Sequence, residues 1–594
     1  MDPAALEALE LPAITARLAG ASSTELGAER AGALEPVTDV EAVVERQALT
    51  AEGVALLDAG VDPPLAGIAD VRGAVARAAR EGTLGPAELR AISSAIRVAL
   101  EARRIVGEQR ALAPLLHDGL SLLDPRLGTV ADQIDRAIEE DGSDVRDTAS
   151  PLLRRLRREL RNGGARVREE LARVARSRDA QEALQETFLA ERGGRPVLAV
   201  RAGARSKVPG IVHDASSTGQ TLFVEPFAVV ELNNRLAEAA ADAREEVERI
   251  LRELSSAVAA QAGDLVALVE TTADVDVVLA SAAVSRSWRG APVTISDDVR
   301  LLAARHPLLD RRTAVPIDLD LDALRAVVIS GPNTGGKTVA LKTLGLAALL
   351  HQCGLRPPAE LVSLPIFDSV LADIGDRQSI EMSLSTFSGH VSTLVEILRS
   401  ATGRSLVLLD EVAAGTDPEE GSALAQALVA RLARQARLTI VTTHYPELKE
   451  WASSTPDVAN AATSFDPDTG RPLYRVDLGR PGTSHALRIA ERLGLDEDVV
   501  ADARARVTPE RLRTAELLAE AQAAERAAVE LRDEAAGTAA RVREREAELE
   551  RELARQREAA ERVRTEAIAA AEAELEAARR ELAELRGELR SARR

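Results

Sequence analysis

The sequence predicts a multidomain protein with three kinds of structure. Helical periodicity dominates to about residue 300 and is interrupted by a small β insertion, and a strand–loop–helix pattern then begins around a glycine-rich loop. After Pro509 the chain is rich in alanine, glutamate, arginine and leucine, which favours a coiled coil. At 594 residues the chain is too long for a single hydrophobic core.

The composition limits the class of protein. Apolar residues make up 45% of the chain but aromatic residues only 2%, so the cores must consist mainly of leucine, valine, isoleucine and alanine. Cys353 is the single cysteine, which excludes an intramolecular disulfide and a thiolate metal cluster. The start, Met1-Asp2-Pro3, does not resemble a signal peptide, and no apolar run reaches the ~18 residues of a membrane span. We therefore expect a cytoplasmic protein without a membrane partner.

The first 300 residues are predicted to be mainly helical. We expect a helical domain over 1–125, followed over 126–300 by long helices that carry a β insertion at about 195–226. Residues 195–200 and 221–224 read as short strands separated by turn residues. Helix is expected from about 129 to 192 and again from 228 to 286.

One of these helices is strongly basic, although the net charge of the whole chain is −20. Ten arginines lie between Arg154 and Arg178, against only three glutamates. The pattern is compatible with a solvated helix face that carries i,i+4 ion pairs, and equally with a surface that faces nucleic-acid phosphates.

An α/β domain is predicted over 301–508. The apolar run 326–329 enters the glycine loop and a helix over 339–350 leaves it, while 407–409 and 438–441 read as further strands. Their nearly continuous apolarity is typical of parallel strands covered on both faces.

Residues 509–594 are predicted to form a coiled coil, with a single charged helix as the alternative. Apolar residues recur there at alternating spacings of three and four. This seam consists of Leu575, Ala578, Leu582, Leu585 and Leu589.

The loop at 331–338 matches the phosphate-binding pattern G-x-x-x-x-G-K-[ST] and has a strand before it and a helix after it. In this pattern backbone N–H groups surround the phosphates, Lys337 reaches the β and γ oxygens, and Thr338 offers a hydroxyl to Mg²⁺. The sequence therefore predicts ATP and Mg²⁺ as cofactors. The predicted binding residues are Gly331, Pro332, Asn333, Thr334, Gly335, Gly336, Lys337 and Thr338.

Two acids and a histidine are predicted to complete this site. Asp410 and Glu411 end the apolar strand 406–409, so Asp410 would hold the metal and Glu411 would orient or deprotonate the attacking water. His444 follows the strand 438–441 and suits a sensor of the γ-phosphate.

These motifs, taken together, resemble the MutS family of ATPases. The residues that carry the resemblance are 331–338, Ser385-Thr386-Phe387, Asp410-Glu411, Gly415-Thr416-Asp417-Pro418 and Thr442-Thr443-His444. Residues 210–214, 221–226, 231–234 and 304–309 look like the second bacterial paralogue of that family, the recombination-suppressing and ribosome-rescue type. The resemblance implies an ABC-type ATPase domain over 301–508, a core over 1–125, and lever helices with a reduced clamp over 126–300.

The resemblance also implies a homodimer with composite active sites. Ser385 would reach the γ-phosphate bound by the partner subunit, and Asn333 would contact the γ-phosphate in its own subunit. The implied function is an ATP-hydrolysing clamp that acts on branched DNA to suppress recombination, or that binds collided ribosomes and splits them. The alternative from a different class is a structural DNA-binding clamp that does not hydrolyse ATP.

Two departures from the family pattern affect these expectations. Arg377 stands where the paralogue usually has an acid, which puts a local ion pair in doubt. Nothing in the sequence matches the Smr nuclease domain through which full-length relatives are endonucleases, so nuclease activity is not assigned to these residues. Only 330 residues precede the loop, and they are assigned to core, levers and clamp, so direct mismatch reading is not expected.

Overall fold

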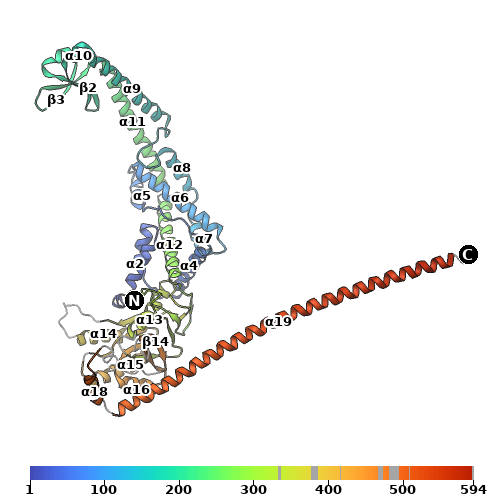
Figure 1. Ribbon diagram of the computed structural model, residues 1–594. Coiled ribbons are helices and arrows are strands. Elements are labelled where there is room, and N and C mark those ends of the chain that lie inside the picture. The colour runs from blue at the N-terminus through green and yellow to red at the C-terminus, as the bar shows by residue number, and fades with distance from the viewer. Residues whose placement is uncertain are drawn as a thin grey trace. The chain divides into compact units, whose positions relative to one another are not determined.

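The computed structural model describes residues 1–331, 336–375, 386–414, 416–465, 472–479, 494–506 and 509–591 (Figure 1). The chain divides into two compact units, Met1–Ser484 and His485–Arg594. The domain boundaries predicted from the sequence stay predictions. No helix in the described ranges has the length and apolarity that crossing a membrane requires.

Short and medium helices make up the beginning of the first unit. They are α1 (Pro3–Ala8), α2 (Leu11–Ala21), α3 (Glu25–Gly32), α4 (Val40–Asp58), α5 (Arg72–Ala78), α6 (Pro86–Glu108), α7 (Pro114–Ser121) and α8 (Leu127–Ala137). Helix α6 shows why they pack: Leu89, Ile92, Ile96 and Ala99 recur at helical spacing and are fully buried. They share one core with α8 and with parts of the long helices described next.

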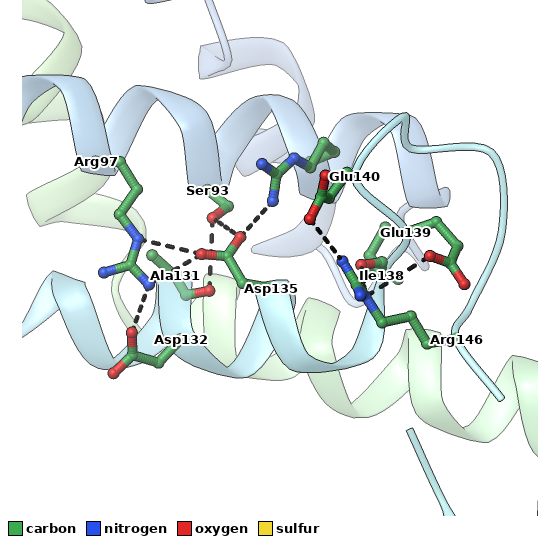
Figure 2. Close-up of polar contacts among 10 residues, drawn as sticks. Ser93, Arg97, Ala131, Asp132, Asp135, Ile138, Glu139, Glu140 and Arg146 are labelled. Carbon is green, nitrogen blue, oxygen red and sulfur yellow. Dashed lines mark hydrogen bonds and ion pairs between the residues drawn. The ribbon is translucent and has the colours of Figure 1, made fainter. Parts of the chain in front are cut away.

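Polar contacts fix α6 against α8 at the edge of this core (Figure 2). The Asp135 carboxylate accepts hydrogen bonds from Ser93 Oγ at 2.5 Å and from Arg97 Nε and Nη2 at 3.1 and 2.9 Å. Burial raises the pKa of Asp135, but the bonds from Ser93 and Arg97 outweigh it, so this pKa lies below its ordinary value. The helical character predicted for 1–125 is thus confirmed.

Long helices and a small sheet follow. The helices are α9 (Pro151–Ala175), α10 (Arg178–Ala183), α11 (Phe227–Ala260) and α12 (Ala262–Ser287), and a 3₁₀ helix spans Ala202–Lys207. The strands are β1 (Leu184–Arg192), β2 (Arg195–Arg201), β3 (Gly210–Ala215) and β4 (Thr221–Pro226), and they pair in the order β1-β2-β4-β3. Helix α9 packs along α11, where an added Cβ at Gly163 would approach Leu236 Cδ2 to 2.5 Å.

The sequence-based boundary of the β insertion was wrong. Residues 184–192 were predicted as the end of a helix, and the insertion was placed at about 195–226. In the structure, residues 184–192 form β1. This strand pairs antiparallel with β2 through a turn at Gly193 and Gly194, both of which have a positive φ. No glycine or proline interrupts 184–192, so only the pairing with β2 shows that the helix has ended.

The α/β part of the first unit contains two sheets. The larger has the order β10-β11-β12-β8-β13-β14, and the smaller has the order β5-β9-β6-β7. Their strands are β5 (Val293–Ile295), β6 (Arg300–Ala304), β7 (Ile317–Asp320), β8 (Ala326–Ser330), β9 (Leu361–Leu364), β10 (Val370–Asp373), β11 (Leu406–Leu409), β12 (Leu438–Thr443), β13 (Val458–Phe465) and β14 (Pro472–Leu478). The helices here are α13 (Lys337–Gln352), α14 (Thr386–Ser400), α15 (Pro418–Gln435) and α16 (Pro446–Ser454).

The larger sheet is covered on both faces, as its apolar strands predicted. Val327 and Ile329 of β8 belong to one hydrophobic cluster, whereas Ala326 and Val328 belong to another. Helix α13 contributes to the first cluster and α15 to the second. All residues of β8, β11 and β12 are buried, so the strand ends are held rigidly.

The second unit contains α18 (Glu497–Arg506) and α19 (Pro509–Ser591). Helix α19 is continuous over its 83 residues. Large apolar side chains along it are exposed, including Leu549, Leu575, Leu582 and Leu585. The predicted coiled-coil pairing of this helix stays a prediction.

Candidate nucleotide-binding site

The candidate site lies where three neighbouring parallel strands end. Strand β12 pairs in parallel with β8 on one side and with β11 on the other. The carboxyl ends of β8, β11 and β12 therefore meet at one edge of the sheet and place Gly331, Asp410 and His444 together. Helix α13 begins at this edge with Lys337, so its N-terminal N–H groups face the same space.

Part of the predicted site lies outside the described residues. These residues are Pro332, Asn333, Thr334, Gly335 and Ser385, together with Arg377 and Gly415. Gly331, Gly336, Lys337, Thr338, Asp410, Glu411 and His444 are described, and the structure brings them together.

Lys337 is a buried cation with uncharged partners. Its side chain lies among the most buried in the chain, and Nζ contacts Gly331 O at 2.9 Å and His444 Nε2 at 2.9 Å. Burial lowers the pKa of Lys337 to about 8, although Glu411 and Asp410 act in the opposite direction. A charged ammonium in this position is stabilised by an anion that approaches from the open side.

Thr338 and Asp410 form the second part of the site. Thr338 Oγ1 donates a hydrogen bond of 2.7 Å to Asp410 Oδ2. The other carboxylate oxygen, Oδ1, accepts a hydrogen bond of 2.5 Å from Thr442 Oγ1. A hydroxyl and a carboxylate at this separation are the hard oxygen ligands that Mg²⁺ prefers.

Glu411 is held in an unusual backbone conformation next to His444. Its φ of 48° lies in the left-handed region, and its N–H donates to Thr442 Oγ1 at 2.8 Å. Glu411 Oε1 lies 3.5 Å from His444 Nε2. Burial and the charge of Lys337 lower the pKa of His444, so the imidazole is neutral at pH 7 and Nε2 accepts from Lys337 Nζ.

Two positions of the loop must be glycine, because other residues lie too close to them for a side chain to fit. An added Cβ at Gly331, whose φ is 136°, would approach Thr463 Oγ1 to 2.2 Å. The same construction at Gly336, with φ of 87°, would approach the Tyr474 ring to 2.9 Å. Both positions therefore need a residue without a side chain.

Sequence reasoning gave Thr442 no role in the site and missed Tyr474. Thr442 connects the Asp410 carboxylate to the Glu411 backbone, and Tyr474 lies against Gly336 with a φ of 55°. Tyr474 could have been singled out from the sequence by its rarity, because the chain has only two tyrosines. The other, Tyr445, donates its hydroxyl to Ala413 O at 2.8 Å, also beside the site.

The described residues fit a magnesium-bound nucleoside triphosphate. Lys337 offers an ammonium to which no carboxylate of the described residues is bonded, Thr338 and Asp410 offer metal ligands, and the start of α13 offers N–H groups. Glu411 and His444 lie next to these groups, with His444 in contact with Lys337, and would be available to a water molecule and to a terminal phosphate.

These features define the class of protein before any relative is considered: an α/β region with a candidate nucleotide site at one sheet edge, together with a helical region that carries a small sheet. The model of MutS domain V matches residues 327–510. The chain is 45% identical over 517 residues to the Endonuclease MutS2 of Thermomicrobium roseum, 43% over 550 to that of Pelotomaculum thermopropionicum, and 42% over 552 to that of Geobacillus kaustophilus.

These alignments cover 84%, 90% and 91% of the chain and 65%, 69% and 69% of the relatives. The chain thus spans about two-thirds of the length of the relatives that it matches. It belongs to the MutS family, in the MutS2-type branch, which confirms the resemblance inferred from its motifs.

Proposed function

We propose that this chain is an ATP-hydrolysing clamp of the MutS2 type that works as a homodimer on nucleic acid. The observation that carries the proposal is the cluster of Lys337, Thr338, Asp410, Glu411 and His444 at one sheet edge, with the geometry described above. Family membership supports ATP as the nucleotide.

Each residue of the cluster receives a role in this proposal. The loop and Lys337 would bind the phosphates, and Thr338 and Asp410 would hold Mg²⁺, an ion that would supply charge neutralisation during phosphoryl transfer. Glu411 positions and deprotonates the attacking water, and His444 contacts the terminal phosphate as a neutral imidazole. Ser385 of one subunit completes the site of the other, a role that rests on the resemblance alone.

The same proposal assigns the domains. Residues 301–508 are the ABC-type P-loop ATPase domain, 1–125 the core, 126–300 the levers with the clamp, and 509–594 a dimerising coiled coil. Because each composite site needs both subunits, ATP binding closes the dimer and moves the levers. The structural support is the packing of α9 and α11 onto the β1–β4 sheet through one shared hydrophobic cluster.

The proposed partner is branched or recombining DNA. Helix α9 supports a nucleic-acid partner, because its exposed arginines lie on the face opposite Leu153, Leu156, Val167 and Leu171. Collided ribosomes expose the same phosphate chemistry and form the competing substrate. The decisive comparison is the stimulation of ATP hydrolysis by four-way DNA junctions and by collided ribosomes; stimulation by neither contradicts the partner assignment.

Glu411→Ala tests the hydrolytic part of the proposal. Loss of a general base costs about 100-fold or more in turnover, while nucleotide binding should persist and the closed dimer should accumulate. Glu450→Ala, at an exposed acid on the neighbouring helix α16, is the control and should hydrolyse ATP normally. Unchanged turnover in Glu411→Ala removes Glu411 from its role, and a wild-type chain that binds ATP without hydrolysing it favours the structural clamp.

A further inference from the structure

A second pocket lies away from the nucleotide cluster. Its volume is about 250 Å³, and it lies between the end of α12, the connection from β6 to β7, and the segment that precedes β9. Trp288, Pro307 and Pro358 form an apolar wall. None of the residues assigned above to ATP or Mg²⁺ lines it.

The charged part of the lining is strongly basic. Arg289, Arg305 and Arg311 converge on the pocket from two separate segments, and Glu360 is the one acid in the lining. Within the described ranges, none of the three guanidinium groups has a carboxylate at ion-pair distance. Arg305 is instead held by two uncharged carbonyl oxygens, with Nε 3.3 Å from Ala314 O and Nη1 3.3 Å from Ala303 O.

The three cations therefore repel one another without full compensation. Arg289 and Arg311 are exposed at the rim of the pocket and Arg305 is half-buried; the pKa of Arg311 is lowered by slight desolvation and by the charges of Arg289 and Arg305, and Glu360 opposes this. Arg289 has a φ of 55° because it directly follows the end of α12, where the N–H of Gly290 donates to Ser285 O at 2.8 Å and closes the helix. A bound anion would relieve the repulsion among the three guanidinium groups.

The charge of the pocket indicates a dianion. His306 lies in the lining and is 6% exposed, and burial lowers its pKa, so the imidazole is neutral at pH 7. Three guanidinium groups and one carboxylate then leave a net charge of about +2. Planar guanidinium groups bind phosphate oxygens in pairs, which suits a phosphomonoester better than the single charge of a phosphodiester.

We infer that this pocket binds a small organic phosphomonoester. Its phosphate lies among Arg289, Arg305 and Arg311, and its organic part lies against Trp288 and Pro307. The volume is just below the ~300–1,000 Å³ of pockets for drug-sized ligands, so the ligand is compact. A nucleoside monophosphate and the phosphorylated 5′ end of a nucleic-acid strand share this chemistry.

Phosphate binding to the full chain tests the site directly. The probe is inorganic phosphate, followed by titration calorimetry, in a Lys337→Ala background that suppresses binding at the glycine loop. We expect one phosphate per chain. Arg289→Gln together with Arg311→Gln should weaken binding at least about 10-fold, whereas Arg312→Gln should leave it unchanged, because the exposed Arg312 does not line the pocket.

Glu360→Gln gives a test of opposite sign that does not depend on the stability of the arginine variants. Removing the one acid in the lining should tighten phosphate binding several-fold. If the arginine substitutions and Glu360→Gln both leave the affinity unchanged, the inference is wrong.

Further binding measurements show whether the pocket prefers a nucleoside monophosphate or a phosphorylated 5′ end of a nucleic-acid strand. A nucleoside monophosphate and a 5′-phosphorylated oligonucleotide are compared with inorganic phosphate and with the same oligonucleotide carrying a 5′ hydroxyl. Tighter binding of either phosphorylated ligand than of inorganic phosphate supports the site and identifies its source. If neither is bound more tightly, the pocket has no organic subsite and the inference is overturned.

Discussion

Lys337 shows at the residue scale how far a motif predicts a site. The glycine-loop pattern and the ends of the apolar strands placed Lys337, Asp410, Glu411 and His444 in one site, because the loop and both strand ends lie at the same edge of the parallel sheet. Thr442 was named only as part of the motif Thr442-Thr443-His444 and received no role, because its hydrogen bond to Asp410 is visible only in the fold. Tyr474 was missed because an aromatic ring on the antiparallel strand β14 has no fixed spacing from the loop.

The lowered pKa of Lys337 makes ATP binding depend on pH. Below about pH 8 the free protein already carries the charged ammonium, so binding takes up no proton there. Above it the amine is neutral, and the phosphates restore the charge by proton uptake. The affinity should then fall by up to about tenfold per pH unit.

Titration calorimetry at pH 7, 8 and 9, in buffers of different ionisation enthalpy, measures this proton uptake. Lys337→Arg is the control, because its guanidinium stays charged over the whole range. If the wild-type chain takes up no proton at pH 9, the lowered pKa of Lys337 is contradicted.

Thr442 tests whether the bond network orients the metal ligand. Thr442→Val keeps the shape but removes the hydrogen bonds to Asp410 and Glu411. Loss of such supporting bonds typically costs about 10–100-fold in metal affinity or activity. The Mg²⁺ concentration that gives half-maximal ATP hydrolysis should rise accordingly.

A matched control is available on the same strand. Thr439 is equally buried, but its Oγ1 has no hydrogen-bond partner among the residues that the structure describes, so Thr439→Val should leave the Mg²⁺ dependence unchanged. Equal behaviour of the Thr442 and Thr439 variants would show that Thr442 does not position the metal ligand.

At the scale of the element, α9 separates the two interpretations that its sequence allowed. Arg157 bonds to Val145 O at 2.7 Å and to Asp147 at 3.0 Å, and Arg173 pairs with Glu170. Arg154, Arg155, Arg158, Arg166 and Arg168 are exposed and have no ion-pair partner within the described ranges. The sequence shows that α9 is rich in arginine, but only the fold shows which of these arginines already pair with a carboxylate.

Replacing Arg154, Arg155 and Arg158 by glutamine should weaken DNA binding and flatten its salt dependence. Each lost contact to duplex phosphate reduces the slope of log K against log salt by about 0.9, so the slope should fall by up to about 3. Binding is measured between low and physiological salt.

The control for this experiment removes charges that are already neutralised. Arg104→Gln with Arg173→Gln removes arginines that pair with Glu101, Glu108 and Glu170. These changes should leave the slope nearly unchanged. If the slope is unaltered in the α9 triple variant, these arginines do not contact DNA and belong to an ordinary solvated helix face.

The β insertion marks the limit of pattern reasoning at this scale. Strands 326–329, 407–409 and 438–441 were predicted correctly, because continuous apolarity over a few residues leaves little alternative in an α/β unit. Strand β1 was missed, because Leu184–Arg192 lacks the continuous apolarity of a buried strand and gains its strand structure from pairing with β2.

At the scale of the whole molecule, the proposed ATP-hydrolysing clamp requires two subunits. Helix α19 is the element that we expect to join them. Leu575, Leu582 and Leu585 are more than half exposed on this helix. Leaving a leucine side chain exposed to water costs about 1.5–3 kcal/mol relative to burying it. A paired helix would bury them, which is the physical reason to expect a coiled coil.

Leu575→Glu with Leu582→Glu should therefore dissociate the dimer. Removing two buried leucines per chain and facing like charges across the seam should weaken association by more than about 100-fold. Sedimentation across a range of protein concentrations measures this change. Ala573→Glu, on the outer face of the same helix, adds a charge without entering the seam and should leave association intact. If the double variant stays dimeric, the coil does not hold the subunits together, and dimerisation must come from the composite ATP sites alone.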